Sequence, residues 1–215
     1  IRAADAGKHI LCEKPLALTV AEISNLFDLA RSHNVALKVG FVLVNHPFYA
    51  IIKKYISELG GIQTVTVVNN ATEGELQPDW YWQKERSGGW FMVSEIHWYH
   101  LFAWLTDEAN LQVRSAGEVD MNSRAMATFS HIVAGATALT VDHRLTTPRP
   151  DVKTTVTITC EHSVITIDDW VPRSITLPSP SLAEPALSVI LSAAKDLFAL
   201  SSSSRKHQRR ILCNQ

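Results

Sequence analysis

The apolar pattern of the first part of the chain predicts a strand, a helix and a second strand. Residues 8–12 form a short apolar run, and Thr19 and Glu22 then have the spacing of a helix-capping box, so a helix is expected to begin near Val20. Its apolar residues recur at i, i+3, i+4 and i+7, which is typical of one buried helical face: Ile23, Leu26, Phe27 and Ala30. Asn34 suits a left-handed helix end, and residues 36–44 predict a second buried strand. Together these elements make a βαβ unit.

The middle of the chain predicts helices followed by several strands. Residues 47–59 form an amphipathic pattern that starts at Pro47, with Asn45 or His46 as the cap, and Gly60-Gly61 ends it. Residues 63–70 alternate as in a strand, with one side formed by Val65, Val67 and Asn69. A helix over 94–105 is followed by predicted strands at 124–133, 136–144, 152–161 and 164–168. Strands without intervening helices favour an antiparallel or mixed sheet, here an α+β fold with helices on one face.

Composition limits the possible partners and location. The chain has 215 residues, 46% of them hydrophobic, which suffices for a sizeable core. A net charge of -1 argues against nucleic acid or a membrane surface as the main partner, and no run of about 18 apolar residues predicts a membrane span. The three cysteines (Cys12, Cys160 and Cys213) are too far apart for a CxxC metal site and fit a reducing cytoplasm.

The tripeptide Glu13-Lys14-Pro15 follows the first predicted strand directly. In open α/β sheets, ligands bind at the carboxyl ends of the strands, so this is the expected position of a site. Taken alone, the tripeptide is equally compatible with a surface ion pair before a proline. Its flanking residues distinguish the two interpretations.

Residues 6–17, which contain this tripeptide, resemble the Glu-Lys-Pro motif of the Gfo/Idh/MocA oxidoreductases, NAD(P)-dependent sugar and inositol dehydrogenases and their relatives. Val39-Gly40-Phe41 resembles the next strand of that family, and residues 88–97 resemble its Gly-rich segment with the catalytic histidine. The resemblance extends over residues 4–177. Because no GxGxxG motif occurs, it implies that the phosphate-binding turn lies upstream in a longer parent protein.

The resemblance implies that the chain is divided into three parts. Residues 1–44 would be the C-terminal remnant of the dinucleotide-binding Rossmann domain, and residues 45–177 an α+β substrate domain whose open sheet face forms a homo-oligomer. Residues 178–215 begin with a Pro/Ser linker and end in a basic cluster. They are expected to be a disordered or non-native tail.

The family's site residues can be carried over to this sequence. Lys14 would accept the proton of the substrate hydroxyl or position it, while Glu13 and a cis Pro15 would lie on the nicotinamide side. His97 would contact the same hydroxyl. Where the family has an aspartate four residues before this histidine, the chain has Val93, so Glu95 is a candidate replacement. The remaining departure is His100, which stands where the family often has an acid.

Substrate and metal contacts are less closely specified. Trp80, Tyr81 and Trp82 are either a core plug or a wall on which a sugar ring stacks. In the family, a polar residue often follows the Val-Gly-Phe strand, whereas residues 42–44 of this chain are apolar. Arg86 or Asn45 could supply the missing polar contact. Glu95, His97 and His100 raise the question of a metal, but the spacing fixes no third ligand, and no metal is predicted.

The sequence therefore predicts part of an oxidoreductase that uses NAD or NADP to transfer a hydride to or from a secondary hydroxyl of a sugar or polyol. The chain alone would be nearly inactive, because binding energy from the remote parts of the nucleotide would be missing. Two alternatives stay open: a non-catalytic ligand sensor on the same scaffold, and an inactive pseudogene product.

Overall fold

A parallel pair of strands begins the fold and places the Glu-Lys-Pro motif. The computed structural model describes residues 1–71, 78–120, 126–145, 154–169 and 174–176. After the short helix α1 (Arg2–Asp5), β1 (Ile10–Cys12) pairs in parallel with β2 (Leu37–Val39), and α2 (Val20–Ser32) connects them. The capping box is confirmed, since the Thr19 hydroxyl accepts from the Glu22 N–H and the Glu22 carboxylate accepts from the Thr19 N–H. Asn34 adopts the expected left-handed conformation, with φ of 53°.

The second strand is shorter than predicted. Instead of continuing to residue 44, the strand ends at Val39, and the 3₁₀ helix η1 (Leu43–Asn45) follows. The reason is pairing: β1 ends at Cys12, whose carbonyl accepts from the Gly40 N–H at 2.8 Å, and the chain then turns away. This turn directs Phe41 out of the two-stranded sheet.

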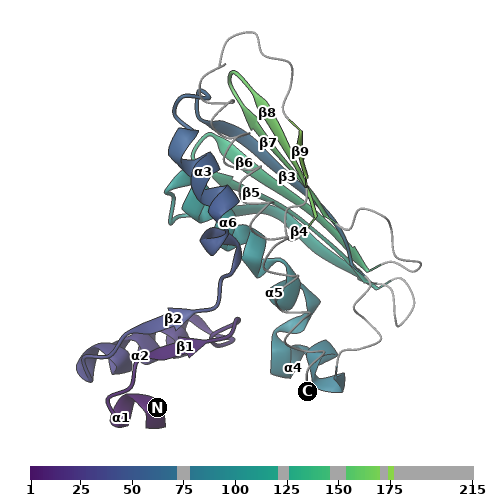
Figure 1. Cartoon of the computed structure of the whole chain (residues 1–215). Helices are drawn as coiled ribbons and strands as arrows, with labels where there is room; N and C mark the ends of the chain where they lie inside the picture. The colour runs from purple at the N-terminus through teal and green to yellow at the C-terminus, as the bar shows by residue number, and fades with distance from the viewer. Residues whose placement is uncertain (72–77, 121–125, 146–153, 170–173, 177–215) are drawn as a thin grey trace, which may run out of the picture.

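A seven-stranded mixed sheet forms the larger part of the molecule (Figure 1), in the order β4-β5-β6-β3-β7-β8-β9. The central pair β3–β6 is parallel, and every other neighbouring pair is antiparallel. The strands are β3 (Ile62–Ala71), β4 (Gln112–Asp120), β5 (Met126–Ala134), β6 (Thr137–Leu145), β7 (Thr154–Cys160), β8 (Val164–Asp168) and β9 (Ser174–Thr176). The predicted α+β class with a mixed sheet is confirmed.

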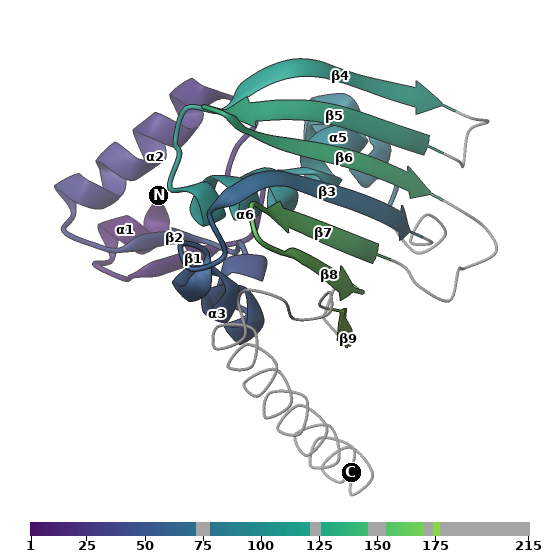
Figure 2. The ribbon, with the colours of Figure 1, turned by 90° about the horizontal axis from the view of Figure 1, so that it is seen from above.

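Helices lie against one face of this sheet (Figure 2). They are α3 (Pro47–Tyr55) and α6 (Ile96–Thr106). Between them in the chain, η3 (Asp79–Trp82), α4 (Lys84–Ser87) and α5 (Gly89–Ser94) lead into α6. His46 caps α3 by accepting from the Phe48 N–H. The helix predicted over 94–105 corresponds to α6, which begins at Ile96 because regular helix is interrupted at Glu95; Ser94 is the last residue of α5.

The core lies between these helices and the sheet. Val65 and Val67 of β3 are buried, as predicted, and they join one cluster with the large side chains of α3 and α6: Phe48, Tyr49, Ile52, Trp98, Leu101, Phe102 and Leu105. Asn69 is also buried on the predicted side, where its carbonyl oxygen accepts from the Thr154 hydroxyl at 2.6 Å and its amide lies 3.1 Å from a His143 ring nitrogen. A polar row therefore crosses three central strands within the buried face.

The structure shows the surroundings of two cysteines and the lengths of the helices. Cys160 is buried, and burial raises the pKa of its thiol to about 11, while Cys12 is half-buried and Cys213 lies outside the described residues. Over the described ranges, no helix is long and apolar enough to cross a membrane. The same ranges contain no cluster of three metal-ligating His, Cys, Asp or Glu side chains.

Lys53 of α3 forms hydrogen bonds with groups at the C-terminal end of α6. Its ammonium donates to the Trp104 carbonyl and, at 2.6 Å, to the Asp107 carboxylate, and it lies 4.9 Å from the centre of the Trp104 ring. A cation at this position satisfies a carbonyl at the helix end and opposes the negative end of the helix dipole.

Lys53→Met is therefore expected to lower the free energy of unfolding by about 1–2 kcal/mol. The exposed Asp107 contributes little of this, because solvent screens its pairing with lysine. Urea denaturation measures the effect, with Lys54→Met as the matched control at an exposed neighbouring lysine. Equal losses in the two variants would contradict the assignment.

Candidate active site

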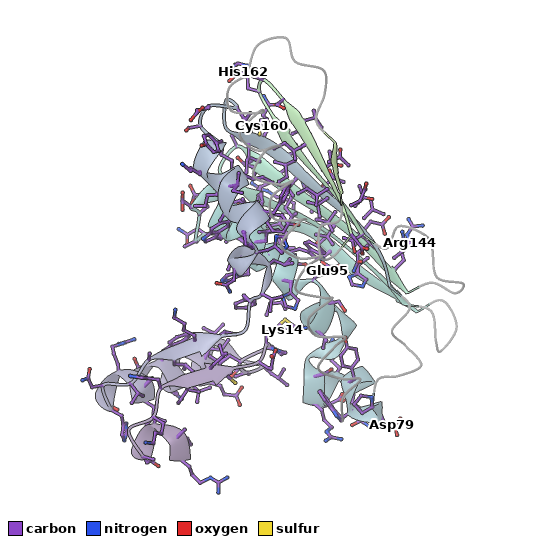
Figure 3. All side chains as sticks on the ribbon, in the orientation of Figure 1. Lys14, Asp79, Glu95, Arg144, Cys160 and His162 are labelled. Carbon is purple, nitrogen blue, oxygen red and sulfur yellow. The ribbon has the colours of Figure 1, made fainter. Side chains whose placement is uncertain are left out.

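Lys14 lies where the two-stranded sheet meets the helices (Figure 3). It follows the carboxyl end of β1, its side chain is half-buried, and its ammonium donates to the backbone carbonyl of Val93 in α5. The Lys14–Pro15 peptide bond is cis, as expected for this motif. The position that holds an aspartate in the family thus meets Lys14 through its main chain rather than through a carboxylate.

His97 is the second group of the site and a neighbour of Lys14. It lies in the first turn of α6 and is buried. Burial, and after it the charges of Lys14 and His100, lower its pKa from 6.5 to about 4. The imidazole is therefore neutral at neutral pH, the form in which one ring nitrogen accepts a hydrogen bond and the other donates one.

Phe41 connects the two histidines of α6, and sequence reasoning did not identify it as a site residue. Its ring stacks on the His100 ring with 3.9 Å between centroids and 10° between planes. The same ring meets His97 edge-on, at 6.2 Å and 90°. Burial lowers the pKa of His100 as well. Phe41 could have been identified from its position, because it directly follows Gly40 at the end of the strand.

The Glu95 side chain points toward the sheet and not toward Lys14. Its side chain is fully buried, and its carboxylate accepts hydrogen bonds from the Tyr99 hydroxyl and, at 2.8 Å, from the Ser130 hydroxyl of β5. Burial and this carboxylate together raise the pKa of Tyr99. Residues two apart on a helix point to different sides, so Glu95 does not occupy the place of an acid at position 93. Figure 3 shows it on the sheet side of the helices, apart from Lys14.

Glu13 lies at the exposed edge of the site. Its carboxylate covers Gly40, where an added Cβ would stand 3.3 Å from Glu13 Oε2. Gly88 allows a second close approach, because an added Cβ there would lie 3.2 Å from the Leu18 side chain. The turn between α4 and α5 therefore rests on the loop that follows Lys14-Pro15.

The residues suggested for substrate contact lie further out. Trp80 in η3 is 44% exposed, so the core-plug interpretation is wrong for this residue, and the stacking wall stays a prediction. Arg86 in α4 is exposed, and its guanidinium donates to the Gln83 side chain at 3.4 Å. Asn45 donates to the Phe41 carbonyl at 3.0 Å. The structure thus brings Lys14, His97, His100 and Phe41 together and leaves Trp80 and Arg86 in solvent.

Comparisons with known proteins match parts of this chain to oxidoreductases. The sequence model described as "Oxidoreductase family, NAD-binding Rossmann fold" matches residues 1–41. Levoglucosan dehydrogenase of Pseudarthrobacter phenanthrenivorans is 47% identical over 58 residues, covering 27% of this chain and 15% of that protein. D-xylose 1-dehydrogenase (NADP(+)) 2 of Haloferax volcanii is 28% identical over 139 residues, covering 58% of this chain and 43% of that protein.

The fold itself matches a solved dehydrogenase. The WlbA dehydrogenase of Bordetella pertussis, solved with NADH and UDP-GlcNAcA, superposes with a TM-score of 0.74 at 20% identity over 94% of this chain and 60% of that chain. The chain spans less than half the length of the curated relatives it matches. Together with the Glu13-Lys14-Pro15 motif, these matches show that the chain is similar to oxidoreductases, and that its residues 1–41 match the Gfo/Idh/MocA family model.

Proposed function

We propose that this chain supplies the catalytic and substrate-binding part of an NAD(P)-dependent oxidoreductase that transfers a hydride between the nicotinamide and a secondary hydroxyl of a sugar or polyol. The observation that carries the proposal is the proximity of Lys14, at the carboxyl end of β1, to the neutral imidazole of His97. The names of the relatives, a levoglucosan and a D-xylose dehydrogenase, support a carbohydrate substrate.

The residues present fit the nicotinamide end of the cofactor. Glu13 and Lys14 end β1 beside Gly40, a position at which a Cβ would crowd the Glu13 carboxylate. A phosphate-binding GxGxxG turn does not occur in this sequence, so we infer that it belongs to upstream residues of a longer protein. When bound, NAD(P) would supply the hydride acceptor or donor.

The protein's own groups would handle the hydroxyl. Lys14 would hydrogen-bond the reacting oxygen and exchange a proton with it, and neutral His97 would orient the same oxygen; the proximity of the two groups supports these roles. Trp80, exposed beside the site helices, would stack on the apolar face of a sugar ring. Glu13 and Pro15 would line the nicotinamide side of this arrangement.

Assembly and location complete the proposal. The outer face of the sheet exposes apolar side chains on three strands: Val68, Phe129 and Val164. Such a face suits a contact with a second copy of the chain, so we infer a homo-oligomer formed through it. A cytoplasmic location is consistent with free thiols at Cys12 and Cys160.

The test uses the longer protein encoded at the source locus, with the upstream nucleotide-binding residues included. A panel of aldoses and polyols is assayed for NAD- or NADP-linked oxidation, and binding of the same compounds is measured by calorimetry. Turnover of one class supports the proposal. The absence of both turnover and binding across the panel would refute it.

A ligand sensor is the second candidate, and position 93 favours it. Val93 offers Lys14 a neutral carbonyl where the family has a carboxylate, so one acid of the family's catalytic set is missing. Sugar or NAD(P) binding without turnover would support the sensor and exclude the enzyme.

A further inference from the structure

Phe41 bridges the strand unit and the histidine helix. It follows Gly40 at the end of β2, and its main chain is fixed on both sides: its N–H donates to the Val39 carbonyl at 2.8 Å, and its carbonyl accepts from Asn45 at 3.0 Å. The side chain is half-buried. These hydrogen bonds fix the backbone position from which the ring reaches α6.

The ring contacts both imidazoles in complementary ways. His97 and His100 are three residues apart on α6 and therefore share a face of the helix. Phe41 stacks closely on His100 at 3.9 Å and is perpendicular to His97 at 6.2 Å, the edge-to-face arrangement that aromatic quadrupoles favour. One side chain thus restricts the rotation of both rings and covers apolar surface that water would otherwise reach.

We propose that Phe41 is a positioning residue, whose ring stacks on His100 and abuts the edge of His97, so that it fixes the His97 imidazole opposite Lys14 across the junction of β2 and α6. The charged groups around His97 are consistent with this role. Lys14 faces it from the end of β1 and His100 from its own helix, while the Glu95 carboxylate is bound by Tyr99 and Ser130. The inference depends on the proposed function at one point, which is that His97 faces the substrate hydroxyl.

Histidine NMR titration of this chain tests the proposal. In Phe41→Leu, water gains access to the rings, so the pKa of His97 is expected to rise from about 4 toward its ordinary value. Phe41→Trp, which keeps a large aromatic ring, is expected to restore much of the low value. Phe48→Leu is the matched control, because Phe48 is buried in the core and its ring contacts are with His46 and Tyr49.

Two outcomes would overturn the proposal. One is an unchanged His97 pKa in Phe41→Leu; the other is an equal change in Phe48→Leu. A second measurement needs no variant: stacking predicts ring-current shifts of the His100 ring protons in the folded wild-type chain, and unperturbed shifts would refute the contact. This measurement stays decisive if Phe41→Leu does not fold.

Turnover provides an independent measurement. In the longer enzyme, Phe41→Leu is expected to lower kcat by about 10- to 100-fold with a smaller change in KM, because a displaced imidazole costs alignment in the transition state. Phe41→Trp should recover part of kcat. A wild-type enzyme without turnover would refute the proposed function and leave the titration result intact, so the two failures are distinguishable.

Discussion

Lys14→Ala in the longer enzyme is expected to lower kcat by about 10²- to 10⁴-fold, the contribution typical of a positioned acid–base group. The reason is geometric. Lys14 follows the end of β1, with its ammonium on the Val93 carbonyl and beside His97, so under the proposed function its removal would leave the hydroxyl without its proton-transfer partner. Steady-state kinetics on the substrate identified in the panel measures the effect.

Lys38→Ala is the matched control for Lys14→Ala. Lys38 is exposed on the neighbouring strand β2, so its loss should leave kcat within about twofold. Lys14→Ala should cost only about 1 kcal/mol of stability, the value of one hydrogen bond, which excludes unfolding as the cause of lost activity. Retention of more than a tenth of the wild-type kcat would show that Lys14 is not the proton-transfer group.

Acid is expected to destabilise this chain between pH 6.5 and pH 4 because of His97. Its pKa is lowered from 6.5 to about 4 in the folded state, by burial first and by Lys14 and His100 next. Between these values the unfolded chain binds the proton that the folded chain excludes, so stability is complete above pH 6.5 and falls as the pH decreases. The loss approaches about 3 kcal/mol as an upper limit at pH 4.

Urea denaturation at a series of pH values tests this prediction, with His97→Gln as the comparison. Burial also lowers the pKa of His46 and His100, and these residues contribute slopes of the same sign in both proteins. The difference between wild type and His97→Gln therefore isolates His97. Identical pH dependence in the two proteins would show that His97 titrates normally.

Local signals predicted helix ends and strand alternation, but not the burial of α2, where Phe27 is exposed and only Ala30 is buried. The capping box at Thr19 and Glu22, the left-handed Asn34 and the alternation of Val65, Val67 and Asn69 depend on neighbours in sequence, and all are confirmed. The strand β4 was missed, because an edge strand needs few apolar residues and Gln112–Asp120 offers little beyond Val113 and Val119.

The sequence proposed residues for the site but could not indicate their contacts. The motif indicated Lys14 and His97, whereas the acceptor at position 93 is a main-chain carbonyl, which every residue type possesses and no sequence pattern reveals. The contacts of Glu95 are a similar case: its carboxylate accepts from the hydroxyls of Tyr99 and Ser130, and Ser130 is remote in sequence. Tertiary contacts decided both features.

The place of β3 in the sheet has a consequence for how the chain folds. β3 is the first strand of the large sheet in sequence, yet its two neighbours are made much later, with Thr64 pairing to Ala138 on one side and Ile62 to Cys160 on the other. The β5–β6 and β7–β8 hairpins involve local pairing, whereas the centre of the sheet has high contact order and closes slowly. During synthesis, both edges of the apolar strand β3 therefore stay unpaired until β6 and β7 have been made. Aggregation competes with folding over that interval.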